Sequence, residues 1–315
     1  MAQATGVKTL KTVIGSYPHT AALKDGTIKP PGLEFEFEEV SPIIAAFRRM
    51  VRALEFDVCE MAITTYLAAK EHDKPFTAIP VFVVRGFHHE ALSYNTAAGI
   101  RTPKDLEGKR VGVRAYTVTT GVWARGVLAS EYGVDLDKVT WVVFDEEHVQ
   151  EYKLPPNVEQ APEGARMPAM LANGELDAAI GAGATDAPNV APLIPDADAV
   201  AAASFARTGV YPINHTVVVK DSLLQSDPGL ARTLYQAFVA AKEEFMQRLG
   251  SGGPLSKDEQ ALASRRKTVG DDPLPYGLEA NRPALEALAR IAYDQRILSR
   301  RVENESLFAS VDGAS

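Results

Sequence analysis

The arrangement of hydrophobic and polar positions predicts strands that alternate with helices along most of the chain. Residues 33–40 place Leu33, Phe35 and Phe37 between glutamates, which is the period-two pattern of a strand with one solvent-exposed face. Residues 76–84 are almost entirely apolar, as expected for a strand that is covered on both faces. Strands that alternate with helices favour a mostly parallel sheet with helices on its faces.

Other segments continue this alternation. Apolar and β-branched runs predict strands at residues 10–16, 56–61, 110–114, 140–144, 176–180 and 210–220. Helices are expected at residues 41–54, 119–132, 167–173 and 230–249, and another is expected to end at residue 69. After a turn at residues 250–254, further helices are expected up to about residue 301. The helix at residues 41–54 would have Ser41 as its N-cap and Pro42 at its first helical position. Residues 181–195 predict a loop.

A polar, turn-rich stretch at residues 94–109 marks the first domain boundary. It separates two α/β runs, and the strand expected after the second run leads back to the first. We therefore expect a discontinuous lobe 1 formed by residues 1–94 and 208–315, and an inserted lobe 2 formed by residues 95–207.

The C-terminal residues 282–308 carry a single apolar stripe. Its members recur at helical spacing and are Leu285, Leu288, Ile291, Ala292 and Leu298. Most such stripes pack on their own domain, and a homo-oligomer interface is the alternative.

Composition and charge narrow the classes of partner. The 315 residues include 33 Lys and Arg against 41 Asp and Glu, a net charge of −8, and no basic block stands out, so nucleic acid is not expected. No apolar run approaches the ~20 residues that a membrane-spanning helix needs, and residues 1–11 lack the apolar region of a secretory signal. We therefore expect no membrane partner and a cytoplasmic location. The single cysteine, Cys59, cannot form an internal disulfide or a cysteine-based zinc cluster.

Sequence motifs for several common chemistries are missing. The chain has no GxSxG, no GxxxxGKS/T, no HExxH, and no GxGxxG after a predicted strand. A nucleotide cofactor is therefore not expected. No lysine is marked as a Schiff-base residue, so pyridoxal phosphate is not expected either.

Four histidines lie at predicted strand ends or in the returning strand: His19, His88, His89 and His215. In a two-domain α/β protein, strand ends and crossovers converge on the ligand cleft. Together with Glu60, which also lies at a strand end, imidazoles in one pocket could shuttle protons or bind a divalent metal. The alternative is that each histidine packs separately or hydrogen-bonds a turn.

Several residues are suited to binding a carboxylate. Thr117, Thr119 and Thr120 lie at the start of a predicted helix, where hydroxyls and free N–H groups favour an anion. Simple N-capping is the alternative. The guanidinium groups of Arg85 and Arg114 could each hold a carboxylate in bidentate fashion, or form a surface ion pair.

A series of short segments resembles the 4,5-dihydroxyphthalate decarboxylase family. The segments run in order along nearly the whole chain, and they are YPHT (17–20), FDVCEM (56–61), AIPVF (78–82), RGFHH (85–89), VGV (111–113), WARG (123–126), GELDA (174–178), TGVYPINH (208–215) and DPLPYG (272–277). The resemblance implies a type II periplasmic-binding-protein-like fold. In that fold two α/β lobes, each with a mixed, mostly parallel sheet flanked by helices, enclose a ligand cleft.

The resemblance also implies chemistry on an aromatic acid. The expected reaction is non-oxidative decarboxylation of a hydroxylated aromatic carboxylate, in which an acid in the cleft protonates the ring and CO2 leaves. We expect His19 and His89 to serve as acid and base, with Glu60 and His215 orienting them or sharing a divalent metal with them. The residues expected to bind the substrate are Tyr17, Arg85, His88, Arg114, Thr119, Thr120, Trp123 and Arg125.

The chain also departs from the family pattern. The family has Arg-His-Ser where this chain has His88-His89-Glu90, an acidic residue near Ala115, and a methionine in place of Asn214. Loss of an arginine at His88 is expected to weaken recognition of a second carboxylate. Two alternatives therefore stay open: a receptor for an aromatic acid or small anion, and a different reaction such as hydrolysis or isomerisation.

Overall fold

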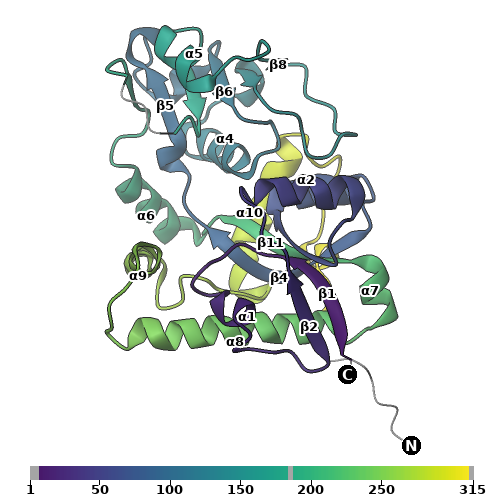
Figure 1. Ribbon diagram of the computed structural model, residues 1–315. Coiled ribbons are helices and arrows are strands. Elements are labelled where there is room, and N and C mark those ends of the chain that lie inside the picture. The colour runs from purple at the N-terminus through teal and green to yellow at the C-terminus, as the bar shows by residue number, and fades with distance from the viewer. Residues whose placement is uncertain (1–6, 184–186, 312–315) are drawn as a thin grey trace, which may run out of the picture. The chain divides into compact units, whose positions relative to one another are not determined.

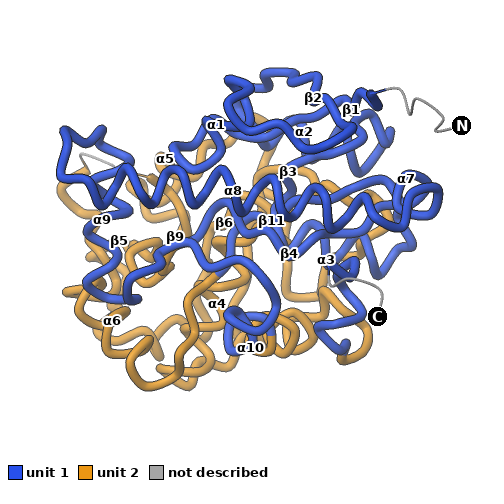
Figure 2. The backbone as a smooth tube through the Cα atoms, turned by 90° about the horizontal axis from the view of Figure 1, so that it is seen from below, with its two compact units in different colours: residues 1–85, 213–285, 302–315 blue, residues 86–212, 286–301 orange. Residues whose placement is uncertain are grey.

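The computed structural model describes residues 7–183 and 187–311, which divide into two compact units (Figure 1). Of the described residues, unit 1 contains 7–85, 213–285 and 302–311, and unit 2 contains 86–183, 187–212 and 286–301 (Figure 2). Each unit is built around its own β-sheet.

The sheet of unit 1 has five strands in the order β2-β1-β3-β11-β4. β1 pairs in parallel with both β2 and β3, whereas β11 lies antiparallel between β3 and β4. The strands are β1 (Lys8–Val13), β2 (Leu33–Phe37), β3 (Val58–Ala62), β4 (Phe76–Arg85) and β11 (Ile213–Lys220). The interior strand β3 is buried at every residue, as its apolar residues lead one to expect, and it also buries the charged side chain of Glu60.

The helices of unit 1 are α1 (Ala21–Lys24), α2 (Ile44–Ala53), α3 (Ile63–Glu71), α7 (Asp221–Ser226), α8 (Leu230–Gly250) and α9 (Lys257–Val269). α8 buries Leu234, Phe238, Ala241 and Phe245, which recur every three or four residues, and it packs against β4 and α1. The N–H of Ala309 donates to the carbonyl of Ala78, which places residues 308–309 along β4.

The sheet of unit 2 has six strands in the order β10-β5-β9-β6-β7-β8. β6 pairs in parallel with β7 and β9, and β7 pairs in parallel with β8, whereas β5 is antiparallel to both β9 and β10. The strands are β5 (Leu92–Asn95), β6 (Arg110–Val113), β7 (Thr140–Val143), β8 (Val158–Gln160), β9 (Ala178–Ile180) and β10 (Val190–Pro192).

The helices of unit 2 are α4 (Thr119–Tyr132), α5 (Met167–Asn173), α6 (Ala197–Thr208) and most of α10 (Arg282–Asp294). Short 3₁₀ helices occur in both units at His89–Ala91, Thr96–Ala98, Pro103–Leu106, Leu136–Lys138, Glu279–Asn281 and Asn304–Leu307. No helix in the described part of the chain is long and apolar enough to cross a membrane.

The domain boundaries differ from those predicted. Residues 86–94 belong to unit 2 because β5 pairs with β9 and β10, and residues 208–212 and 286–301 join the same unit. The stripe of α10 and the segment after it, from Leu285 to Leu298, is buried within this single chain.

Most predicted elements are present within a few residues, and α4 and α5 have the predicted limits. The helix expected from Pro42 begins at Ile44 instead. Several elements were not predicted, among them β5, β8, β10 and α6. β10 lies in the predicted loop, and α6 is an alanine-rich helix that buries only Ala201, so it lacks the apolar period that reveals a helix in a sequence.

Candidate functional site

A buried carboxylate, Glu60, lies on the interior strand β3 of unit 1. In the register between β3 and β11, Glu60 lies opposite Val217 and Ala62 lies opposite His215, so Glu60 and His215 are diagonal neighbours on adjacent strands. His215 Nδ1 lies 2.6 Å from Glu60 Oε1. Because a carboxylate can only accept, Nδ1 carries the proton of this hydrogen bond.

Two further donors to Glu60 come from the loop that follows β1. The hydroxyl of Tyr17 donates to Oε1 at 2.7 Å, and the N–H of Gly15 donates to Oε2 at 2.7 Å. Thr20 stabilises this loop, because its hydroxyl accepts a hydrogen bond from the N–H of Tyr17 and donates one to the carbonyl of Gly15. A Cβ atom at Gly15 would lie 2.5 Å from the Tyr17 ring, so only glycine allows the ring to lie this close to the backbone.

These donors determine the charge of Glu60. Its side chain is fully buried, which by itself would raise the pKa, but the hydrogen bond and charge of His215 outweigh this. The contact with His215, together with the hydrogen bonds from the N–H of Gly15 and the hydroxyl of Tyr17, holds the pKa of Glu60 below its usual value. The group is therefore a carboxylate at neutral pH. Burial, reinforced by the negative charge of Glu60, raises the pKa of Tyr17, which stays a donor.

His19 lies beside this group with its ring stacked on that of Tyr17, at 5.4 Å between centroids. Its Nε2 lies 3.0 Å from the carbonyl oxygen of Val83, which can only accept, so Nε2 carries the proton. Burial lowers the pKa of His19 to about 4, and the ring is therefore neutral at pH 7. Its Nδ1 is then a buried acceptor with no hydrogen-bond partner among the described residues.

The arrangement in unit 1 suits acid–base chemistry. A carboxylate that holds one imidazole nitrogen fixes the tautomer and stabilises the imidazolium, which leaves the other nitrogen to exchange a proton with a ligand. The side chain of His215 is 20% exposed, whereas that of Glu60 is 0% exposed. His215 is therefore the member of the pair that a ligand can reach.

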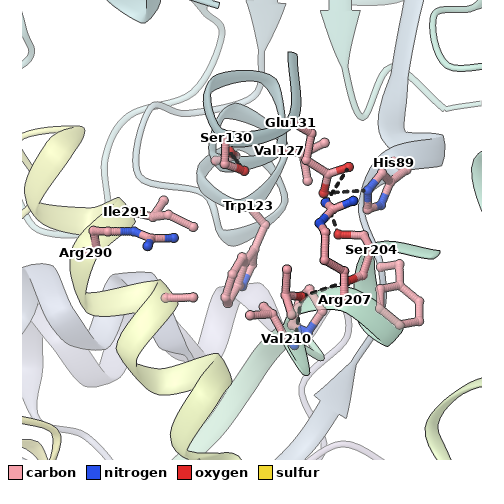
Figure 3. A pocket seen from close by; sticks show the side chains of 15 residues that line it. His89, Trp123, Val127, Ser130, Glu131, Ser204, Arg207, Val210, Arg290 and Ile291 are labelled. Carbon is pink, nitrogen blue, oxygen red and sulfur yellow. Dashed lines mark hydrogen bonds and ion pairs between the residues drawn. The ribbon is translucent and has the colours of Figure 1, made fainter. Parts of the chain in front are cut away.

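His89, the third histidine expected to act in catalysis, has its contacts within unit 2. Its Nε2 lies 3.2 Å from Glu131 Oε1, which also accepts from the hydroxyl of Ser204 at 2.6 Å. Burial would raise the pKa of Glu131, but the hydrogen bonds from His89 and Ser204 and the charges of His89 and Arg207 hold it below its usual value. His89, Glu131 and Ser204 line a pocket with Trp123 (Figure 3).

The structure thus brings Tyr17, His19, Glu60 and His215 together in unit 1 and places His89 beside Glu131 in unit 2. Among residues 7–183 and 187–311, no three His, Cys, Asp or Glu side chains are arranged to hold a metal ion. The divalent metal therefore remains a prediction for which the described residues provide no ligand set.

The residues expected to bind a carboxylate make internal contacts. Arg85 Nη1 donates to Asn281 Oδ1 at 2.5 Å and to the carbonyl of Pro275, and Arg114 pairs with Asp145 at 3.4 Å. Arg125 is fully buried: its Nε donates to Gln295 Oε1, and its guanidinium lies over the rings of Tyr116 and Trp141. His88 is buried and Glu90, its neighbour in the altered segment, is exposed.

The carboxylate of Glu147 lies close to the N-terminus of α4. Glu147 accepts from the backbone N–H groups of Tyr116 and Thr117 and from the hydroxyl of Thr117. This carboxylate binds the loop immediately before Thr119 and Thr120, the two threonines expected to hold the substrate. Glu147 follows β7 in the sequence, and nothing in its local pattern connects it with α4.

Comparison with known proteins identifies relatives along the whole chain. A protein from Comamonas testosteroni, named 4,5-dihydroxyphthalate decarboxylase, is 31% identical over 316 residues, which cover 95% of this chain and 96% of the relative. This chain belongs to the 4,5-dihydroxyphthalate decarboxylase family. A second relative of that name, from Pseudomonas putida, is 35% identical over 180 residues, or 55% of this chain and 69% of the relative.

Membership of the decarboxylase family makes the chain an enzyme of the carboxy-lyase class, as predicted from the ordered motifs. A family model described as NMT1/THI5 like matches residues 32–166.

Two solved structures align with this chain over most of its length and share its fold. The periplasmic aliphatic sulphonate binding protein SsuA from Escherichia coli aligns with a TM-score of 0.57 at 13% identity, covering 98% of this chain and 95% of SsuA. The desulfurization enzyme DSZB aligns with a TM-score of 0.55 at 14% identity, covering 96% of each chain. The predicted periplasmic-binding-protein-like fold is confirmed, and this fold is shared by a binding protein and an enzyme.

Proposed function

We propose that this protein is a non-oxidative decarboxylase of a hydroxylated aromatic carboxylate, with 4,5-dihydroxyphthalate as the first substrate to test. Both curated relatives are named 4,5-dihydroxyphthalate decarboxylase, which supports the reaction class and the choice of this first substrate. The observation that carries the mechanism is the buried Glu60 carboxylate, which receives three hydrogen bonds, one of them from His215 Nδ1.

In the proposed reaction, His215 is the acid. Its imidazolium, stabilised by Glu60, gives the Nε2 proton to the ring carbon that bears the carboxylate. The bond between this carbon and the carboxylate carbon then breaks, CO2 leaves, and the electron pair of that bond restores the aromatic ring. One proton replaces one CO2, so no oxidant or reductant is needed.

His19 would act on a ring hydroxyl of the substrate. Its neutral Nδ1 can accept from a phenolic O–H, which raises the electron density of the ring and favours protonation at carbon. An unsatisfied buried acceptor costs about 1–3 kcal/mol, and a bound hydroxyl would remove that cost. Tyr17 is then a positioning residue, because it donates to Glu60 and stacks on His19. This mechanism assigns no step to His89.

CO2 release from a panel of substrates tests the proposal. The panel contains 4,5-dihydroxyphthalate, phthalate, 3,4-dihydroxybenzoate and 4-hydroxybenzoate, each with and without a chelator. We expect release from 4,5-dihydroxyphthalate and none from phthalate, which lacks a ring hydroxyl. We expect His215→Gln to lower kcat by two to four orders of magnitude, the usual contribution of a positioned general acid. Lys257→Gln, an exposed change in the same unit, is the control.

Three other outcomes of this experiment would change the proposal. Full activity of His215→Gln would contradict the assignment of the acid, and activity lost on chelation would replace proton transfer alone with a metal-assisted reaction. No release from any compound, together with a ligand-induced rise in Tm, would replace the decarboxylase with a receptor for aromatic acids, the alternative function that the fold also permits.

A further inference from the structure

Unit 2 contains a pocket of about 180 Å³ whose lining residues all belong to that unit. Figure 3 shows Trp123 near its centre, with His89, Glu131 and Ser204 on one side and Arg290 and Ile291, from α10, on the other. None of these residues takes part in the Glu60 group or in the proposed proton transfer.

The size of the pocket matches one substituted aromatic ring. A dry cavity of ~150 Å³ lined by apolar side chains can hold benzene, so about 180 Å³ leaves room for a ring with small substituents. Trp123, Val127 and Ile291 supply aromatic and aliphatic walls. α4 and α10 approach closely here, since a Cβ atom at Gly126 would lie 2.6 Å from the Cδ1 of Ile291.

One end of the pocket can accept a hydroxyl. Glu131 Oε1 receives the hydrogen bonds from His89 and Ser204, whereas Oε2 accepts no hydrogen bond from a described residue and lies 4.0 Å from Arg207. The pKa of Glu131 is below its usual value, so Oε2 is a charged acceptor at neutral pH.

The other end supplies a positive charge. Arg290 has no hydrogen bond or ion pair with any described residue, and its side chain extends from α10 on the side of the pocket away from His89 (Figure 3). Arg207 is balanced by Glu131, so Arg290 is the excess cation of the pocket. A guanidinium without a partner is a bidentate donor for a carboxylate.

We propose that this pocket is a second ligand site, which binds a hydroxylated aromatic monocarboxylate with its ring against Trp123, its carboxylate on Arg290 and its hydroxyl on Glu131. If the proposed function is correct, decarboxylation of a hydroxylated aromatic dicarboxylate yields a compound of this class. The site would then sense product, although its existence does not depend on that reaction.

Calorimetric titration of the full chain with 4-hydroxybenzoate tests the site. Benzoate lacks the hydroxyl and phenol lacks the carboxylate, so both should bind more weakly. Arg290→Gln should weaken 4-hydroxybenzoate about fivefold, because an exposed charge pair contributes up to ~1 kcal/mol. Arg300→Gln, which removes an exposed arginine from the same unit, should leave the affinity unchanged. Val127→Phe should abolish binding by filling the pocket.

Three results would overturn the site: no saturable binding to the wild-type chain, equal affinities for Arg290→Gln and Arg300→Gln, or loss of binding in His215→Gln alone. The last result would place the ligand at the Glu60 group. CO2 release from the same preparations reports separately on the proposed function. A chain that binds 4-hydroxybenzoate through Arg290 and releases no CO2 would refute the reaction and retain the site.

Discussion

Both units contain a glutamate paired with a histidine, but they bury opposite members of the pair. In unit 1 the Glu60 side chain is 0% exposed and that of His215 is 20% exposed, whereas in unit 2 His89 is 4% exposed and Glu131 is 14% exposed. The contact is also shorter in unit 1, at 2.6 Å against 3.2 Å. Unit 1 therefore presents an imidazole to a ligand, and unit 2 presents a carboxylate.

This difference separates two uses of the same two side chains. A buried carboxylate held by three donors stays charged and orients an accessible imidazole, which is the arrangement of a proton donor. A buried imidazole that holds a more accessible carboxylate provides a hydrogen-bond acceptor, which is suited to binding. The arrangement around each pair, rather than its composition, distinguishes the two.

The largest expected effect is that of Glu60→Gln. An amide in place of the carboxylate can no longer stabilise the imidazolium of His215, so kcat should fall by two to four orders of magnitude. CO2 release at saturating substrate measures this. Glu34→Gln, an exposed change on β2, is the matched control. Equal kcat values for the two variants would remove the functional distinction between the units.

Acid should destabilise unit 1 through His19. Burial lowers its pKa to about 4 in the folded protein from the usual 6.5, so the unfolded chain binds more protons between these values. Stability present above pH 6.5 is lost as the pH falls to about 4. The loss is about 3 kcal/mol, or about two orders of magnitude in the unfolding equilibrium.

Urea unfolding between pH 7 and pH 4 tests this loss. His19→Asn should show a flatter dependence on pH, because it lacks the titrating ring. An unchanged slope in this variant would assign the acid sensitivity to other groups. The lowered pKa of Glu60 adds its own loss at lower pH, as its carboxylate takes up a proton.

A smaller effect is expected for Gly15→Ala. The added methyl group would lie 2.5 Å from the Tyr17 ring and displace it, so Glu60 would lose one of its three donors. We expect about a tenfold fall in kcat, equivalent to ~1.4 kcal/mol for one hydrogen bond to a charged group. Gly253→Ala, where no atom lies within 4 Å of the added methyl, should retain wild-type kcat. A matching loss in both variants would count against the role of Tyr17.

The sequence predicted the local elements of this fold better than the contacts between distant segments. Apolar periodicity placed α4 and α5 within their observed limits. No strand was predicted at β5, and the predicted boundary between residues 94 and 95 divides it, because its four residues carry too little pattern to show that they pair with β9. Pairing of distant strands depends on tertiary packing, which a single sequence does not display.

The same limit applies to the candidate site. The motifs predicted Tyr17, His19, Glu60 and His215, and the structure places these four close together. Glu131 was missed, although helical spacing puts it on the same face of α4 as Trp123 and Val127 and could have revealed it. Gly15 was missed because its role depends on the position of one ring rather than on a sequence pattern.

The position of β11 has a consequence for the order in which the protein is made. β11 lies between β3 and β4, but it follows all of residues 86–212 in the chain. During synthesis, β3 and β4 therefore leave the ribosome long before β11, the strand that pairs with both of them. Glu60 is translated well before His215, its hydrogen-bond partner. Domains that are complete in sequence can fold as they emerge, but unit 1 cannot. Its sheet and its acid–base pair are completed only after residues 86–212 have been translated, so a truncated product that ends within these residues would lack the proposed acid.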